Sequence, residues 1–505
     1  MKCRTFVEAS PEVIYVPTKY KTIQEAINQA NSGDTIFVHK GTYYENVVVN
    51  KSVSLVGEDR ISTIVDGNRK GSVISITAHD VNISCFTIRH GGNSYYDSGI
   101  YVDHSSGNNI SYNVITDNND GISLYSSVNN VVSGNIVTDN NDGISLYSSA
   151  NNVVSGNIVT DNNYGISLYS SANNVVSGNI VSSNNYDGIS LYSSANNVVS
   201  GNIVSSNNYD GIVFYYSANN TVFGNTIPLN SNYGMYLSLY SGNNTIYFNN
   251  FNNSYQVWND SVNVWDDGDE GNYWSDYTGQ DLNGNGIGDT AYVIDVDNQD
   301  NHPLMGMFSD FSITLEGKMY HVTTICNSTI SEFRFEVGPE TGNKIIHFNV
   351  TSKDSTEWFM RVMIPTELMD YPYIALVGAE EIIPTLLDIS NETHAYLYFT
   401  YYGSQIIAII SSKTLHLYNE LYNELLDKHL KLQMDLYNLN ATYYEHLIDY
   451  SVLLGYYSQL LNSYNELNSS YQELLLDYYE SVYNIRNLMY IFAATTAIFI
   501  ITIIY

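Results

Sequence analysis

A segment of about 22 residues repeats almost letter for letter in the middle of the chain. The copy "DGISLYSSANNVVSGNIVTDNN" at 142–163 has close copies on both sides, and Gly121, Gly143 and Gly165 mark the period. A fixed period of this length is typical of a solenoid, in which no repeat buries its apolar face alone. Apolar and polar residues alternate, Asn, Gly and Ser mark turns, and no stretch is long enough for a helix. The pattern therefore predicts coils of short strands stacked as a parallel β-helix.

Equivalent residues of successive coils should lie above one another in such a stack. The repeat predicts an inward apolar column and two columns of asparagines whose side-chain amides bond from coil to coil. These columns are Ile122, Ile144, Ile166, Ile189 and Ile212; Asn130, Asn152, Asn174, Asn197 and Asn220; and Asn135, Asn157, Asn179, Asn202 and Asn225. We interpret the near-identity of the repeats as recent duplication rather than as a repeated binding site.

Residues 13–67 differ from the repeats of 68–257. Their "TIQEAINQA" predicts a short amphipathic helix capped by Thr22, with Glu25 three residues on, and we expect it to cover the open end of the solenoid. This segment resembles the start of pectinesterase-like and pectate-lyase-like β-helix proteins, and the repeats resemble the NosD family. The closing segment at 258–306, with "GNYWSDYTGQDLNGNGIGDTAYVIDVDNQDNHPLM", is similar to that of NosD-like surface proteins of archaea. The resemblance implies a right-handed parallel β-helix on an archaeal, membrane-anchored surface protein.

The closing segment also carries the clearest chemical motif. "DLNGNGIGD" has oxygen donors at positions 1, 3, 5, 7 and 9 of an EF-hand-type loop, with Gly286 at position 6. We predict that this loop binds a structural calcium ion, although Tyr292 stands where the bidentate glutamate is usual; the alternative is a plain Asn/Gly turn. The predicted ligands are Asp281, Asn283, Asn285, the Ile287 carbonyl and Asp289, with Asp295, Asp297 or Asp300 supplying a further oxygen. The nearby Trp258, Trp265 and Trp274 are expected to cap the last coil rather than to form a sugar platform.

A copper site and a catalytic site are two further possibilities that the sequence allows us to examine. The NosD resemblance implies copper handling, but the only cluster of soft ligands is His302, Met305 and Met307, which we interpret as the chain leaving the solenoid. An enzyme of this fold would need convergent acids, or a basic residue beside calcium. The repeats instead offer aspartate columns, which we interpret as a solvated rim, with cation bridging as the alternative: Asp117, Asp139 and Asp161, and separately Asp120, Asp142, Asp187 and Asp210. No Lys or Arg occurs between Arg89 and Lys318, so the repeats lack a lyase base.

The rest of the chain predicts three more parts. Alternating strands at 307–412 predict a small β-sandwich. Tyr mostly at position a and Leu mostly at d of an unslipped heptad repeat predict a coiled-coil stalk at 413–488. Apolar e positions favour a parallel homo-oligomer, most of all a trimer; an antiparallel hairpin is the alternative, but only Gly455 interrupts the run. Residues 489–505 reach the lower limit for a transmembrane helix. Residues 1–13 lack the apolar core of a signal peptide, so we expect the protein to extend beyond one or both ends of this sequence.

Composition narrows the function. The net charge of −33 argues against nucleic acid and anionic membrane surfaces as partners. Three distant cysteines offer no disulfide framework, whereas sequons such as Asn50-Lys51-Ser52 favour an extracellular glycoprotein. The sequence thus predicts an all-β head and sandwich on a coiled-coil stalk anchored in the cell membrane. The expected function is structural or adhesive, with surface glycans or surface-layer proteins as partners. The alternative is a polysaccharide-binding or polysaccharide-cleaving head on the same stalk.

Overall fold

A computed structural model describes residues 11–411, apart from 95, 239, 340–341 and 353–355, together with residues 425–436. The chain divides into two compact units. The first extends to Asp310 and also includes Thr324–Asn327, and the second comprises Phe311–Thr323 and the chain from Ser328 onward. We call the first unit the head.

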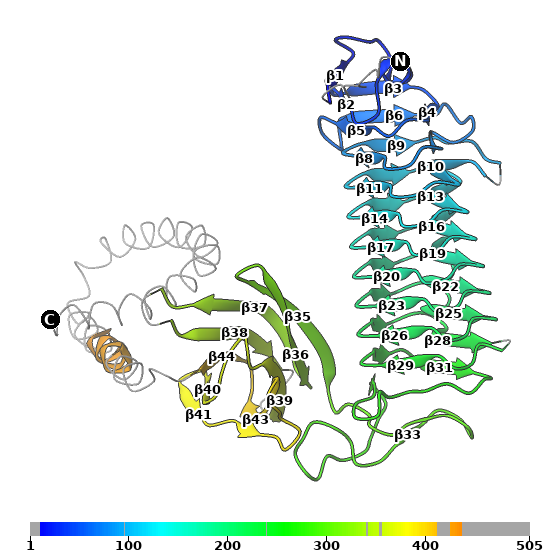
Figure 1. The fold of residues 1–505 in the computed structure, drawn as a ribbon. Helices are drawn as coiled ribbons and strands as arrows, with labels where there is room; N and C mark the ends of the chain where they lie inside the picture. Colours follow the sequence, from blue (N-terminus) through cyan, green and yellow to red (C-terminus); the bar gives the residue numbers. More distant parts are fainter. Residues whose placement is uncertain are drawn as a thin grey trace, which may run out of the picture. The chain divides into compact units, whose positions relative to one another are not determined.

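The head is the predicted right-handed parallel β-helix. Within its described residues, three parallel sheets of eleven, ten and eleven strands run along the solenoid, and each coil gives one short strand to each sheet (Figure 1). Strands of neighbouring coils pair in register without slipping, because the repeats have nearly constant length. Ile122 pairs with Ile144 and Ile144 with Ile166, for example. The three sheets are called A, B and C below.

Sheet A contains β1 Val13–Val16, β2 Thr35–Val38, β5 Ser54–Gly57, β8 Asn82–Ser84, β11 Asn109–Ser111, β14 Val131–Ser133, β17 Val153–Ser155, β20 Val175–Ser177, β23 Val198–Ser200, β26 Thr221–Phe223 and β29 Thr245–Tyr247. Sheet B contains β3 Gly41–Tyr44, β6 Thr63–Asp66, β9 Thr87–Arg89, β12 Val114–Thr116, β15 Ile136–Thr138, β18 Ile158–Thr160, β21 Ile180–Ser182, β24 Ile203–Ser205, β27 Thr226–Pro228, β30 Asn250–Asn252 and β32 Tyr273–Trp274. Sheet C contains β4 Val47–Val49, β7 Ile74–Ile76, β10 Ser98–Asp103, β13 Asp120–Tyr125, β16 Asp142–Tyr147, β19 Tyr164–Tyr169, β22 Ile189–Tyr192, β25 Ile212–Tyr215, β28 Tyr233–Ser238 and β31 Tyr255–Asn259.

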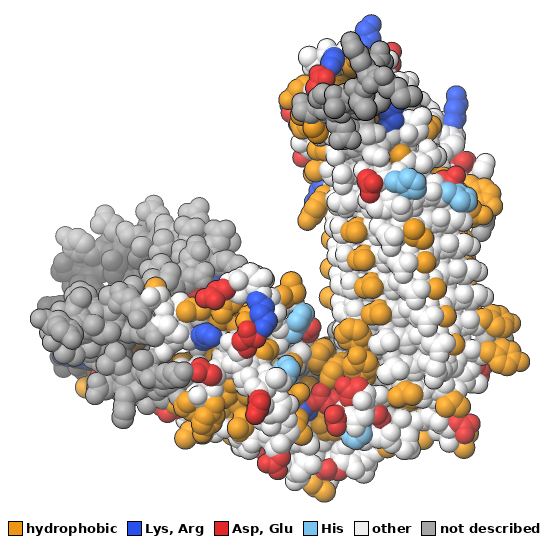
Figure 2. All heavy atoms as spheres, viewed as in Figure 1, with side chains coloured by type: hydrophobic (Ala, Val, Ile, Leu, Met, Phe, Trp, Pro, Cys, Tyr) orange, Lys and Arg blue, Asp and Glu red, His pale blue; other side chains and the backbone are white. Residues whose placement is uncertain are grey.

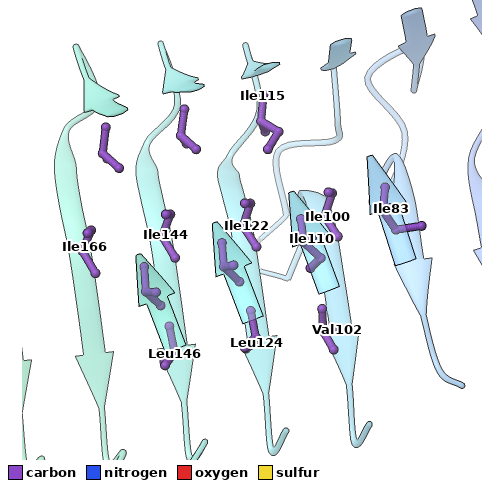
Figure 3. Packing of buried hydrophobic residues seen from close by; sticks show 14 of the residues in the cluster. Ile83, Ile100, Val102, Ile110, Ile115, Ile122, Leu124, Ile144, Leu146 and Ile166 are labelled. Carbon is purple, nitrogen blue, oxygen red and sulfur yellow. The ribbon is translucent and has the colours of Figure 1, made fainter. Parts of the chain in front are cut away.

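The interior of the β-helix is a stack of aliphatic columns. The predicted isoleucine column is fully buried, and a leucine column lies beside it, as Ile144 and Leu146 show (Figure 3). Sheets A and B each add one buried valine per coil, for example Val154 and Val159. Every coil buries the same few side chains against its two neighbours. The first and last coils each lack one neighbour, so both ends of the core must be covered by other residues.

Asparagine ladders hold the corners of the coils. Asn157 Nδ2 donates to Asn179 Oδ1 over 2.9 Å, and Asn152 Nδ2 donates to Asn174 Oδ1 over 3.0 Å, so both predicted ladders are confirmed. A third ladder, which was not predicted, turns the chain between sheets B and C at Asn118, Asn140, Asn162, Asn184, Asn207 and Asn230. All three ladders are buried, and each amide bonds to the next, so the interior turns leave few polar groups unsatisfied.

The predicted cap covers the first coil. Helix α1, Ile23–Gln29, begins at Thr22, whose side chain accepts a hydrogen bond from the Glu25 backbone amide over 3.1 Å. Ile23 and Ile27 are fully buried against the first strands. At the other end, Trp265 and Trp274 are buried and close the last coil, as predicted for a capping role. The same prediction is wrong for Trp258, which is half-buried in sheet C and stacks on Tyr236 with ring centroids 4.6 Å apart.

The second unit contains two small antiparallel sheets, as the alternating pattern predicts. One sheet has the order β35 Met307–Leu315, β36 Lys318–Cys326, β39 Glu357–Pro365, β43 His394–Tyr402 and β42 Thr385–Leu386. The other has the order β37 Thr329–Val337, β38 Lys344–Thr351, β44 Gln405–Ser411, β40 Tyr373–Val377 and β41 Glu380–Ile382. A further two-stranded pair, β33 Tyr292–Val293 and β34 Gln299–Asp300, belongs to the closing segment of the head.

Most of the predicted stalk and the whole of the predicted anchor at 489–505 lie outside the described residues. The described part of the stalk, residues 425–436, is helical. Among the described residues, no helix combines the length and the apolar character needed to cross a membrane.

Candidate functional site

The outer face of sheet C carries stacked rows of tyrosines, and we call this surface the tyrosine face. In the central row the ring centroids of Tyr147 and Tyr169 are 4.8 Å apart, and those of Tyr169 and Tyr192, and of Tyr192 and Tyr215, are 5.1 Å apart. The planes of these pairs differ by 5° to 18°, so the rings lie face to face along the helix axis. Neighbouring rings therefore cover one another's faces, and the four side chains of this row are half-buried.

A second row of tyrosines flanks the first on the same side of the β-helix. Tyr164 and Tyr186 stack at 4.8 Å, and Tyr186 and Tyr209 are 48% and 52% exposed. These two exposed tyrosines are the single-residue insertions that lengthen two repeats from 22 to 23 residues. The sequence pattern alone did not lead us to the two rows, although the 22-residue spacing of Tyr147 and Tyr169 was a sufficient signal.

A column of carboxyl groups lies under these tyrosines. Asp120, Asp142, Asp187 and Asp210 are exposed by only 4%, 7%, 6% and 1%. Asp120 pairs with Asp142 in neighbouring strands, and Asp187 Oδ1 accepts a hydrogen bond from the Asp210 backbone amide over 3.3 Å. The predicted solvated rim is therefore wrong for this column, because all four side chains are buried. It holds for Asp117, Asp139 and Asp161, which are exposed at left-handed turns.

Burial changes the acid–base behaviour of the covered column. It raises the pKa of Asp120 to about 8, with a further increase from the neighbouring Asp142, and raises the pKa of Asp142 and of Asp187 to about 6. The stretch between Arg89 and Lys318 contains no cation that could offset this cost. The column can hold protons at neutral pH, but at these exposures it offers no carboxylate to a ligand in solution.

The predicted calcium loop has the backbone shape that such a loop requires. Asp281 accepts hydrogen bonds from the backbone amides of Gly284, Asn285 and Gly286, at 2.8, 3.1 and 2.7 Å. Gly286 has φ 83°, the left-handed conformation that the sharp turn at position 6 needs. Asp289 folds back over the start of the loop, where its Oδ2 accepts from the Leu282 amide over 2.6 Å.

Two of the three carboxylates predicted as alternative extra ligands, Asp300 and Asp295, accept hydrogen bonds from other residues of the closing region. Asp300 is buried and accepts hydrogen bonds from the Asn272 amide, the Trp274 indole and the His302 amide, at 2.7, 2.8 and 3.0 Å. Burial raises its pKa to about 6 against these bonds. Asp295 accepts from Asn298 and Asn259, and Asp297 is exposed. Among the described residues, no group of three or more His, Cys, Asp or Glu side chains could hold a metal. The loop thus offers Asp281, Asn283, Asn285, Ile287 and Asp289, and calcium binding stays a prediction.

Copper does not fit the described residues. The ring of His302 faces Asp266, with Nδ1 and Oδ1 3.7 Å apart, and Met307 is exposed. No set of soft ligands closes around a common point there, because Pro303 and Leu304 are buried in the turn that separates His302 from the methionines.

These features define a right-handed parallel β-helix protein with capped ends and a polar, aromatic outer face. Residues 27–187 and 89–279 match the family model described as "Periplasmic copper-binding protein (NosD)", so the match spans half of the chain, from 27 to 279. The chain belongs to the NosD family. None of the curated proteins compared matches the sequence.

Several solved structures are similar to this chain at low sequence identity. The Dettilon tailspike protein is 13% identical, with a TM-score of 0.42, over 79% of this chain and 94% of that one. The A-module of an Azotobacter vinelandii mannuronan C-5 epimerase is 16% identical, with a TM-score of 0.32, over 46% and 88%. An alginate lyase from a Paenibacillus species is 14% identical, with a TM-score of 0.31, over 52% and 98%. At these values the likeness is one of fold.

Proposed function

We propose that this chain is a non-catalytic cell-surface protein, structural or adhesive, whose tyrosine face contacts surface glycans. The observation that carries this proposal is a contrast at the tyrosine face: Tyr186 and Tyr209 are 48% and 52% exposed, whereas every carboxyl of the column beside them is at most 7% exposed. Phenol hydroxyls both donate and accept hydrogen bonds, and ring edges add apolar contact. Such a surface suits a neutral polyol, and a hydrolase or lyase would need its acids open to the substrate.

The remaining features support a location outside the cytoplasm. The NosD family is described as periplasmic, and the sequons at Asn50 and Asn391 have exposed asparagines. The predicted coiled-coil stalk and membrane helix would hold the head at the cell surface. Surface-layer proteins are then candidate partners beside glycans, and the asparagine ladders would give the head the rigidity of a spacer.

Glycan-array binding with the full chain tests the proposal. We expect retention of neutral glycans, and a loss of at least about tenfold in apparent affinity for the double variant Tyr186→Ala, Tyr209→Ala, since both side chains are exposed on the face. Tyr44→Ala, at an exposed tyrosine of sheet B, is the matched control and should bind like the wild type. Failure to retain any glycan, or equal binding by all variants, would remove the glycan contact from the account.

We further propose that the 281–289 loop binds calcium as a structural ion. The loop has few apolar side chains of its own beyond Ile287, which pairs with Leu304, so a cation would stabilise its fold. At a calcium concentration well above the dissociation constant of weak extracellular sites, we expect the melting temperature of the protein to rise by about 2–4 °C. Asp289→Asn should abolish the rise, and Asp269→Asn, in a neighbouring exposed loop, should keep it. A melting temperature that changes with neither calcium nor chelator would contradict calcium binding and favour the alternative of a plain Asn/Gly turn.

A further inference from the structure

The corner between sheets A and B forms an aliphatic ridge along four coils of the head. A column of glycines at left-handed φ makes the corner itself. An outward isoleucine column follows it in sheet B, and on the sheet A side an outward serine column lies between the glycines and an outward valine column. The valines pair in register from coil to coil, and so do the isoleucines. The aliphatic ridge consists of Val131, Val153, Val175 and Val198; Gly134, Gly156, Gly178 and Gly201; and Ile136, Ile158, Ile180 and Ile203.

The ridge is exposed, and its crest is bare backbone at Gly156, Gly178 and Gly201, whereas the Tyr112 ring lies against Gly134. Ile158, Ile180 and Ile203 expose 39%, 40% and 44% of their surface, which is unusual for isoleucines repeated in one column. A side chain at Gly156 would meet nothing within 4 Å, and one at Gly178 would reach only the backbone of the coil before it. Columns of hydrophobic side chains run along the middle coils in Figure 2. Another molecule could therefore approach the crest closely.

The ridge is also uncharged. The outward side chains of β14, β17, β20 and β23 are valine and serine, and those of β15, β18, β21 and β24 are isoleucine, threonine and serine. The chain as a whole carries a net charge of −33, which makes identical copies repel one another. The nearest acids, Asp139 and Asp161, lie at the next corner, beyond Thr138 and Thr160. Two copies that meet along the ridge thus bring together the part of the head with the least like charge.

The chain itself covers the continuation of the ridge. Phe308 is only 7% exposed, and its ring lies 3.6 Å from the position that a Cβ would take at Gly224, the next glycine of the corner. Asn250 holds this segment by two hydrogen bonds with the Phe308 backbone, of 2.7 and 2.8 Å. Where the chain covers the corner, threonine and asparagine replace the isoleucine column, at Thr226 and Asn250. The isoleucines therefore remain where the described residues of the head supply no cover.

We propose that the aliphatic ridge is the contact between heads of parallel copies of this chain. The inference rests on the predicted stalk, whose heptads favour parallel assembly. In the described part of that stalk, Leu425, Leu432 and Leu436 are 50%, 70% and 63% exposed, as expected of a helix whose partners are other copies. Four coils extend only about 20 Å along the helix axis. A contact of that length is too short to bury the area of about 800 Å² per partner that a stable interface requires. The ridge contact therefore depends on the stalk, which raises the effective concentration of the heads.

Cysteine crosslinking in the full chain tests the contact. Ile180→Cys, treated with a short bismaleimide that joins two thiols, should give crosslinked copies as its main product. Tyr209→Cys, at a 52% exposed residue of the tyrosine face against 40% for Ile180, and the wild type with its native cysteines should stay at background. Equal crosslinking of Ile180→Cys and Tyr209→Cys would overturn the proposal, and so would capture of Ile180→Cys by an unrelated protein alone.

A charge placed on the ridge separates this inference from the stalk prediction. Adding Ile158→Glu to Ile180→Cys should lower the crosslinking at least about fivefold. Adding Ile61→Glu to Ile180→Cys instead, at a 71% exposed isoleucine away from the ridge, should leave the crosslinking unchanged. Sedimentation equilibrium of the same full-length proteins reports the stalk. If the protein is oligomeric but Ile158→Glu does not change the crosslinking, the ridge contact alone is wrong. If the wild type is monomeric, both the ridge contact and the stalk prediction are wrong.

Discussion

Ile166→Asp should destabilise the head by more than about 4 kcal/mol at neutral pH. Ile166 is fully buried between Ile144 and Ile189, so a carboxylate there would lose water and meet only aliphatic neighbours. The coil could not shift to expose it, because a slip of one residue would turn the whole repeat inside out. Chemical denaturation should show the loss, and hydrogen exchange should show that protection falls first in the coils next to the substitution.

Ile158→Asp is the matched control for that experiment. The side chain comes from the same repeat and undergoes the same change, but it is 39% exposed on the outer face of sheet B. We expect it to cost less than about 1 kcal/mol. Similar losses for the two variants would mean that the inward and outward faces of the coil are wrongly assigned.

Asp120→Asn should stabilise the head by about 2–4 kcal/mol at pH 8 and leave it nearly unchanged at pH 4. Burial raises the pKa of Asp120 to about 8, so the folded chain keeps a proton that the unfolded chain releases near pH 4. The wild type therefore loses stability as the pH rises from about 4 to about 8. The amide has nearly the shape of the protonated acid and carries no proton to lose, so the variant escapes this part of the loss.

Urea denaturation of both proteins across that pH range measures the effect. Asp139→Asn, at an exposed turn of the same repeat family, should follow the wild type at every pH. A constant difference between Asp120→Asn and the wild type from pH 4 to pH 8 would show that Asp120 is ionised in the folded head, and hence that the tyrosines do not cover it.

The period made most of the head predictable. Because equivalent residues repeat every 22 or 23 positions, the inward isoleucines and the two asparagine ladders follow from spacing and polarity alone. The capping helix lies outside the repeats and follows from its own amphipathic pattern and the cap at Thr22. The third ladder, at Asn140 and its equivalents, had the same period and could have been found by the same reasoning.

The outer face was harder to predict. Whether Asp120 is solvated depends on where the rings around it come to rest, and alternation along one strand carries no information about cover from neighbouring coils. The closing segment is similar in this respect. Asp300 was one of three alternatives predicted to supply a further calcium oxygen, but in the structure it accepts hydrogen bonds from Asn272 and Trp274 in the last coil. No periodicity constrains such single contacts.

The central claim is that the head binds at its tyrosine face without cutting what it binds. The most direct measurement is the chain length of a neutral polysaccharide retained by the full protein during a long incubation, with Asp120→Asn and Asp142→Asn in parallel. The account predicts unchanged chain length and equal retention by all three proteins, since both acids are covered. Progressive shortening by the wild type that either substitution abolishes would contradict it and make the column an active site.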